Sequence, residues 1–130
     1  MRNRRNYFAL VVGGILAIVT VLIVVDRISF YRTSIVSVAK VSHLNAGGHH
    51  PEIVFNAMSG QRYELPASSW WSVTAGQEVA IRYDPDDPGA TVVIDSVFNI
   101  WIWAALPLIL SIIFLVTAIK GESFDNVSIR

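Results

Sequence analysis

The three histidines of this 130-residue chain, His43, His49 and His50, lie close together in a glycine-rich stretch. Neutral imidazoles are good ligands for Zn²⁺ or Cu²⁺, and Glu52 would add an oxygen ligand. Their spacing matches no established structural metal site, and adjacent residues of an extended chain point to opposite sides. We therefore predict a solvated loop, with a metal-binding protein or metal-dependent enzyme that uses these histidines as an alternative.

Acidic residues form a second cluster. Asp84, Asp86 and Asp87 carry the hard oxygen ligands that Ca²⁺ prefers, but they lack the regular spacing of a calcium loop. Turn chemistry accounts for each aspartate, and the prolines between them cannot donate to a sheet. We therefore predict a structural turn fixed by Asp84, Pro85 and Pro88.

The stretch PASSWWSVTAG places three serines beside two tryptophans. Ser68, Ser69 and Ser72 follow no glycine elbow and have no recognisable base partner, so the sequence predicts no hydrolase, no catalytic residue and no cofactor. Trp70 and Trp71 are hard to bury together. We expect one to pack on the core of the folded domain and the other to rest at a membrane interface or to bind a protein partner.

The segments described above lie between two long uncharged stretches, residues 7–25 and 100–119. A nineteen-residue helix rises about 28 Å, close to the thickness of a bilayer's hydrocarbon core, so each stretch is predicted to be a transmembrane helix. A signal peptide explains the first stretch less well, because the apolar run is long and no small-residue cleavage site follows. Ala9, Gly13 and Ala17 share one helix face, which favours close packing with another helix.

Charged residues at the helix ends predict the orientation of the chain. Arg2, Arg4 and Arg5 precede the first helix and Lys120 follows the second, which places both termini in the cytoplasm. The sequence thus predicts a multi-pass protein of the bacterial inner membrane. Its parts are a cytoplasmic N-terminus (1–6), a first transmembrane helix (7–25), an extracytoplasmic domain (26–99), a second transmembrane helix (100–119) and a cytoplasmic tail (120–130).

The central domain shows the alternation of β-strands. Val79, Ile81 and Tyr83 alternate with more polar residues, which indicates a strand with one buried face. Ser59-Gly60 is a good hairpin turn between two further strands. The strands are predicted at 34–43, 53–55, 63–65, 77–83 and 91–95, with a loop at 45–51. With no helix expected inside the domain, about five strands would have to curl into a small barrel or sandwich.

Three segments carry a resemblance: PEIVF at 51–55, GQEVAIRY at 76–83 and DPDDP at 84–88. Together with the two apolar stretches, they resemble a bacterial family of two-helix membrane proteins that is catalogued as a domain of unknown function. The resemblance implies a β-rich extracytoplasmic loop between two membrane helices, and it carries over no catalytic residue.

Composition narrows the function further. Ten basic and ten acidic residues balance, so the chain has no basic field for nucleic acid, and the absence of cysteine excludes disulfides. The remaining function is recognition of a protein partner at the lipid bilayer, with Trp70 and Trp71 as predicted contacts. The most concrete version is an immunity protein that protects the cell against a secreted bacterial toxin. Alternatives are an accessory or assembly subunit of a larger membrane complex, or a periplasmic metal-binding protein; a homo-oligomer is compatible with each.

Overall fold

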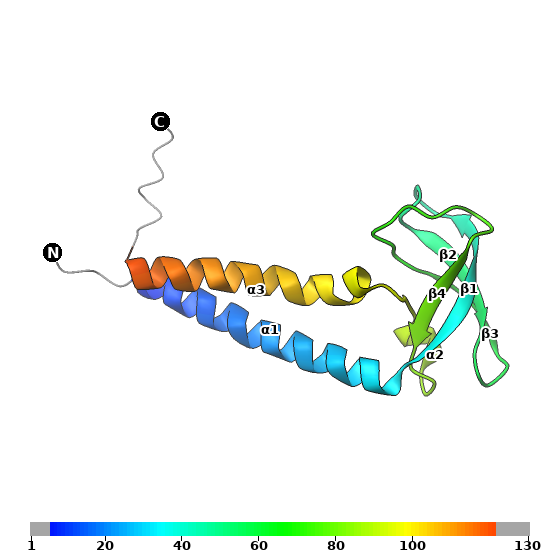
Figure 1. Ribbon diagram of the computed structural model, residues 1–130, viewed down its shortest axis with the longest axis horizontal. Helices are drawn as coiled ribbons and strands as arrows, with labels where there is room; N and C mark the ends of the chain where they lie inside the picture. Colours follow the sequence, from blue (N-terminus) through cyan, green and yellow to red (C-terminus); the bar gives the residue numbers. More distant parts are fainter. Residues whose placement is uncertain (1–5, 122–130) are drawn as a thin grey trace. The chain divides into compact units, whose positions relative to one another are not determined.

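The computed structural model describes residues 6–121, so the predictions for the N-terminal arginines and most of the C-terminal tail lie outside the described residues. Two long apolar helices flank a five-stranded antiparallel sheet (Figure 1), as the sequence predicts. The elements are α1 (Tyr7–Thr33), β1 (Ile35–Leu44), β2 (Pro51–Asn56), β3 (Arg62–Pro66), β4 (Glu78–Tyr83), α2 (Pro88–Thr91), β5 (Val93–Ile94) and α3 (Val97–Lys120). They divide into a helical unit, with residues up to 25 and from 102 onward, and a β-domain of residues 26–101.

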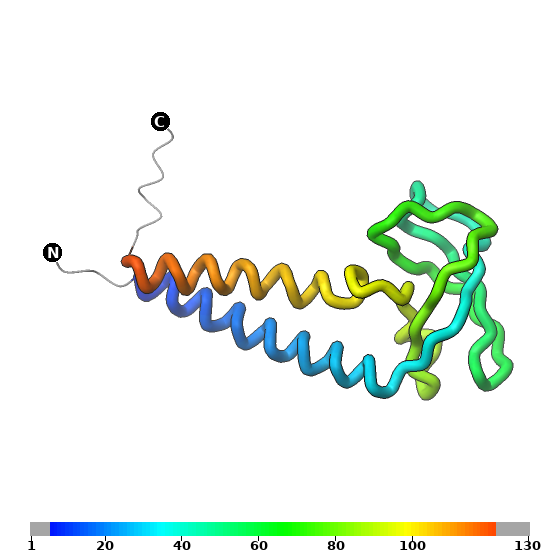
Figure 2. Tube along the Cα trace, viewed as in Figure 1, coloured from blue at the N-terminus to red at the C-terminus, as the bar shows by residue number. Residues whose placement is uncertain are grey.

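In the helical unit, α1 and α3 lie side by side (Figure 2) and pack closely at a glycine. A Cβ atom at Gly13 would lie 2.8 Å from Cγ of Leu115 and 3.1 Å from its backbone nitrogen. The Ser111 hydroxyl donates a hydrogen bond of 2.9 Å to the Gly13 carbonyl. Of the predicted small-residue face, Ala9 and Gly13 are buried and Ala17 is partly buried. Small side chains thus allow the two backbones to approach.

Both helices are long and apolar enough to cross a membrane by length and composition. They extend beyond the predicted bounds, because α1 continues to Thr33 and α3 begins at Val97. The extension of α1 carries the adjacent Asp26–Arg27 ion pair, so the last residues of the helix lie beyond its uncharged segment. The sheet follows at once, since Ser34 N–H still donates to the Phe30 carbonyl and β1 begins at Ile35.

The sheet has the strand order β3-β2-β1-β4-β5 and curls into a half-barrel (Figure 1). All four strand pairs are antiparallel. A register shift between Val41 and His43 interrupts the pairing of β1 with β2. Such an irregularity bends a strand and increases its twist, which helps a small sheet to curl around its own core.

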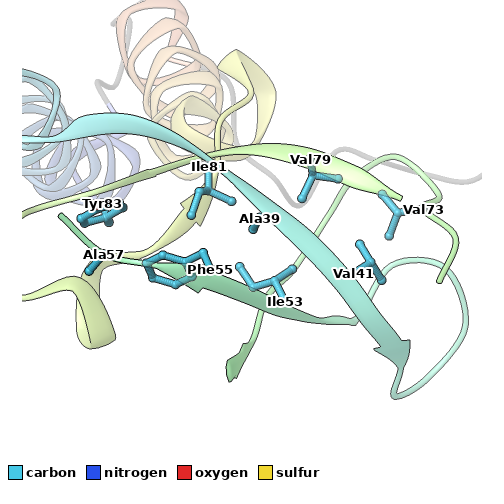
Figure 3. Close-up of a cluster of buried hydrophobic side chains, with 9 residues drawn as sticks. All are labelled: Ala39, Val41, Ile53, Phe55, Ala57, Val73, Val79, Ile81 and Tyr83. Carbon is cyan, nitrogen blue, oxygen red and sulfur yellow. The ribbon is translucent and has the colours of Figure 1, made fainter. Parts of the chain in front are cut away.

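The hydrophobic core lies on one face of this sheet (Figure 3) and follows the alternation of the sequence. The predicted inward residues Val79, Ile81 and Tyr83 are all buried, which confirms the period of two in β4. The Tyr83 hydroxyl accepts a hydrogen bond of 3.0 Å from the Met58 N–H. The complete cluster consists of Ala39, Val41, Ile53, Phe55, Ala57, Val73, Val79, Ile81 and Tyr83.

The connections agree with the sequence at one turn and differ at another. Gly60 has a φ of 86°, and its N–H donates to the Ala57 carbonyl, so the predicted hairpin turn forms. The predicted strand at 91–95 is wrong at its start, because Thr91 ends the short helix α2, where no helix was expected. Asp87 caps this helix by accepting a hydrogen bond from the Ala90 N–H, and Pro88 fits its first turn.

Candidate functional site

The histidines lie in two different places, because His43 belongs to strand β1 whereas His49 and His50 belong to the loop that follows it. His43 Nδ1 lies 3.2 Å from the Ser42 hydroxyl, whereas His49 Nδ1 lies 2.9 Å from the Ser69 carbonyl oxygen. A carbonyl only accepts, so this His49 nitrogen carries the proton. Glu52, the proposed fourth ligand, accepts a hydrogen bond from the Asn45 side chain. Residues 6–121 contain no group of three or more histidine or acidic side chains placed to hold a metal ion.

Backbone hydrogen bonds join the histidine loop (residues 45–50) to the tryptophan loop (residues 67–76). Ser69 N–H donates to the His49 carbonyl, and Val73 N–H donates to the Gly48 carbonyl, each at 2.9 Å. A Cβ atom at Gly48 would collide with the Ser72 side chain, so a glycine is needed where the loops meet. Val73 is buried in the core and so anchors the tryptophan loop to the domain. Spacing along the sequence does not indicate that the two loops meet.

The tryptophan loop presents both of its indole rings outward. Trp70 and Trp71 are 49% and 68% exposed, so neither packs in the core, where we expected one of them. Val73 fills the core position instead. The buried Ser69 hydroxyl donates to the Trp71 carbonyl at 2.6 Å and accepts from the Trp71 N–H at 3.2 Å. The backbone beneath the two rings is therefore held by its own serine.

Both tryptophan rings contact the beginning of α3. Trp70 meets Phe98 edge to face with ring centroids 5.1 Å apart, and Trp71 lies 6.3 Å from the same ring. The Trp70 N–H donates a hydrogen bond of 3.1 Å to the side-chain oxygen of Asn99. The loop is thus attached to the first turn of an apolar helix, which is a contact that spacing along the sequence did not indicate.

In the acidic turn, the carboxylates of Asp84 and Asp87 accept hydrogen bonds from other groups of the chain. Asp84 accepts from the Thr33 hydroxyl at 2.8 Å and from the Asp86 N–H at 3.0 Å. Asp87 caps α2, with Pro88 as its first residue. Pro85 lies between these two aspartates in the turn. These contacts tie the end of α1 to the end of β4.

Arg82 is one of the polar residues that alternate with the buried residues of β4, yet most of its own side chain is covered as well. Arg82 lies 3.2 Å from Asp95 and donates to the Ser34 hydroxyl at 3.3 Å. Its guanidinium group also lies 4.2 Å from the centroid of the Tyr31 ring, in cation–π geometry. The pairing of Arg82 with Val93 places this group beside the short edge strand β5. Arg82 therefore joins α1, β4 and the segment that leads into α3.

The sheet face opposite the core borders a hollow of about 480 Å³, which the core residues Ala39, Val41 and Phe55 also line. Val36 and Val38, on the central strand β1, are 54% and 59% exposed on this face. Lys40 pairs with Val54 on one side and with Glu78 on the other, so apolar and charged side chains alternate. The polar and apolar side chains that line the hollow include Val38, Lys40, Val54, Asn56, Arg62 and Glu78.

The structure consists of two apolar helices and an intervening β-domain. The chain is 35% identical over 78 residues to the Immune protein Tsi4 of Pseudomonas aeruginosa. The aligned part covers 59% of this chain and 54% of that protein, so the chain spans about half the length of the curated relative it matches. No family model matches the chain, and no solved structure matches it.

Proposed function

We propose that this chain is a non-enzymatic immunity protein that is anchored in the bacterial inner membrane by α1 and α3 and binds a toxin through its β-domain. The observation that carries the proposal is the similarity to an immune protein. The folded β-domain supports it, because a preformed surface loses little conformational entropy when a partner binds. Toxin inactivation by binding needs no chemistry from the immunity protein.

The two helices support the membrane part of the proposal. Only 17% of each 18-residue apolar window is buried, so most of its side chains face outward. Tyr31 near the end of α1 and Trp101 near the start of α3 have ring centroids 6.3 Å apart, as expected of neighbours in an interfacial aromatic belt. With the N-terminal arginines in the cytoplasm, the β-domain faces the periplasm.

Two exposed surfaces of the β-domain are available to a toxin. The first is the hollow around Val38 and Lys40, and the second is the tryptophan loop with Trp70 and Trp71. Exposed tryptophans are frequent anchors of protein interfaces, whereas a hollow with both apolar and charged side chains gives shape and charge selectivity.

Co-expression with a toxin tests the protective function. A candidate toxin gene, sought among the neighbours of this chain's own gene, is directed to the periplasm of a sensitive strain, with or without the chain, and survival is counted. We expect survival only with the chain, in proportion to the ratio of chain to toxin, and with the recovered toxin unchanged in mass. A chain that is present in the membrane fraction but gives no survival contradicts immunity. A toxin of altered mass contradicts binding without catalysis.

Protease accessibility tests the topology separately. Protease added to intact spheroplasts should cleave between residues 26 and 99 and leave a terminal tag intact. Permeabilised spheroplasts provide the control, because the tag should then be lost as well. Cleavage of the tag in intact spheroplasts, with the central domain spared, would invert the proposed orientation.

A further inference from the structure

We propose that Trp70, Trp71 and Phe98 form a lipid-binding patch that seats the β-domain in the headgroup region of the bilayer. This aromatic patch lies within the β-domain and consists of two loop residues and one residue from the first turn of α3. The proposal rests on the proposed function in one respect only, because it requires α3 to enter a membrane. It does not require that the partner be a toxin.

The place of Phe98 in the chain gives the depth of the patch. Phe98 is the second residue of α3, and the uncharged apolar run of that helix follows directly. Trp101 lies one turn further on the same helix face and contacts Tyr31 of α1. Because Trp70 and Trp71 both contact Phe98, they belong to the level at which the helix begins its apolar run. That level in a membrane protein is the interface between headgroups and acyl chains.

The chemistry of the exposed side chains fits this interface. Trp70 and Trp71 each present an apolar ring and a polar N–H group, and Phe98 adds a ring that is 45% exposed. In the described part of the chain, the hydrogen bonds that Trp70 and Trp71 donate come from their backbone N–H groups, which leaves the indole N–H groups to headgroup oxygens. Tryptophan is enriched at membrane interfaces because one end of its side chain is apolar and the other is polar.

The patch is held in place before it meets any lipid. Ser69 is bonded to His49 through the backbone and to Trp71 through its hydroxyl group. Val73 anchors the other side of the loop in the core and bonds to Gly48. The Asn99 side chain accepts a hydrogen bond from the Trp70 N–H and donates one of 3.4 Å to the Ile94 carbonyl. A patch with a fixed backbone loses little conformational entropy on binding, so the histidine loop is a positioning element for it.

Depth-dependent fluorescence quenching tests the proposal on the full chain. The chain contains four tryptophans, so Trp101→Phe with Trp103→Phe leaves Trp70 and Trp71 as the only indole emitters. The matched control is Trp70→Phe with Trp71→Phe, which leaves the helix tryptophans. Both proteins are reconstituted in vesicles of phosphatidylethanolamine and phosphatidylglycerol, with bromine atoms near the headgroup or near the end of the acyl chain. Circular dichroism confirms that both variants keep the wild-type helix and strand content.

We expect the emission of Trp70 and Trp71 to shift to shorter wavelength in vesicles and to lose more intensity to shallow bromines than to deep ones. Quenching of the helix tryptophans without quenching of the loop pair would overturn the patch and leave the membrane helices intact. An absence of quenching in both proteins would overturn membrane insertion and the patch together. A loop pair that responds only when toxin is added would identify a protein-binding site and contradict lipid binding. If shallow bromines quench the loop pair but the chain gives cells no protection against the toxin, the patch is supported and the immunity proposal fails.

Discussion

The helical unit and the β-domain distribute their apolar side chains in opposite ways. In α1 and α3 most of the large apolar side chains face outward, and the buried positions of α1 are Ala9, Gly13 and Thr20. In the β-domain, large apolar residues such as Ile53 and Ile81 are fully buried, and the alternate positions are mostly exposed. These opposite burial patterns support the proposal that the helices lie in a membrane and that the domain folds outside it.

The β-domain departs from this pattern where large apolar side chains are exposed. Val36 and Val38 are exposed on the outer face of the central strand, and Trp70 and Trp71 are exposed beside α3. Apolar side chains that a water-soluble domain leaves uncovered often mark binding surfaces. The contrast with the buried core therefore separates the residues that hold the domain together from those that are available to a partner or a lipid.

The largest predicted effect contrasts two valines of β1. Val41→Ala should lower the free energy of unfolding by about 2–3 kcal/mol, because it removes two buried methyl groups and leaves a cavity. Val38→Ala, on the exposed face of the same strand, should change it by no more than about 0.5 kcal/mol. Urea unfolding of the full chain in detergent, followed by near-ultraviolet circular dichroism, measures both. Equal losses of stability in the two variants would contradict the burial of Val41 and the exposure of Val38.

Two adjacent glycines test the packing of the helices. A Cβ atom at Gly13 would press against Leu115, including its backbone nitrogen, whereas Gly14 has nothing within 4 Å. Gly13→Ala should therefore lower the stability of the helix pair relative to Gly14→Ala, by about 1–3 kcal/mol, which is typical of overpacking. Titration with a denaturing detergent, monitored by far-ultraviolet circular dichroism, gives the difference. Equal stability of the Gly13→Ala and Gly14→Ala chains would contradict the close packing of α1 against α3 at Gly13.

The coarse fold could be predicted from sequence because each element carries a strong local signal. Uncharged runs mark the helices, and the alternation in residues 79–83 marks a buried strand face. The candidate site could not be predicted in the same way, because its contacts join distant residues. Trp70 meets Phe98, and His49 meets Ser69, and neither pair shares a motif or a period. The short helix α2 was missed because β-branched Thr91 favours a strand locally, while the Asp87 cap decides the outcome.

A third prediction contrasts two arginines of the β-domain. Arg82 bridges Asp95 and Ser34 and stacks on Tyr31, with only 14% of its side chain exposed, whereas Arg62 lies exposed on the edge strand β3. Arg82→Ala should lower the free energy of unfolding by about 1–2 kcal/mol, because it leaves Asp95 partly buried without its partner. Arg62→Ala should be close to neutral in the same urea unfolding experiment.

Arg82→Lys refines this prediction. Lysine keeps the charge but has no planar group to contact aspartate, serine and the tyrosine ring together, so part of the stability should still be lost. Full stability in Arg82→Lys would reduce the role of this residue to its charge. A loss in Arg62→Ala as large as in Arg82→Ala would remove the distinction between buried and exposed arginines.

The smallest predicted effect concerns the histidines and distinguishes a positioning contact from a solvated side chain. His49→Ala removes the contact of Nδ1 with the Ser69 carbonyl and should lower stability by about 0.5–1 kcal/mol, whereas His50→Ala should have little effect on stability. The diagnostic measurement is amide hydrogen exchange at Ser69 and Val73, whose N–H groups donate to the histidine loop. Exchange at both amides should accelerate in His49→Ala and stay unchanged in His50→Ala. Unchanged exchange in both variants would mean that the tryptophan loop keeps its shape without His49, so that Val73 and Asn99 alone hold the two indole rings outward.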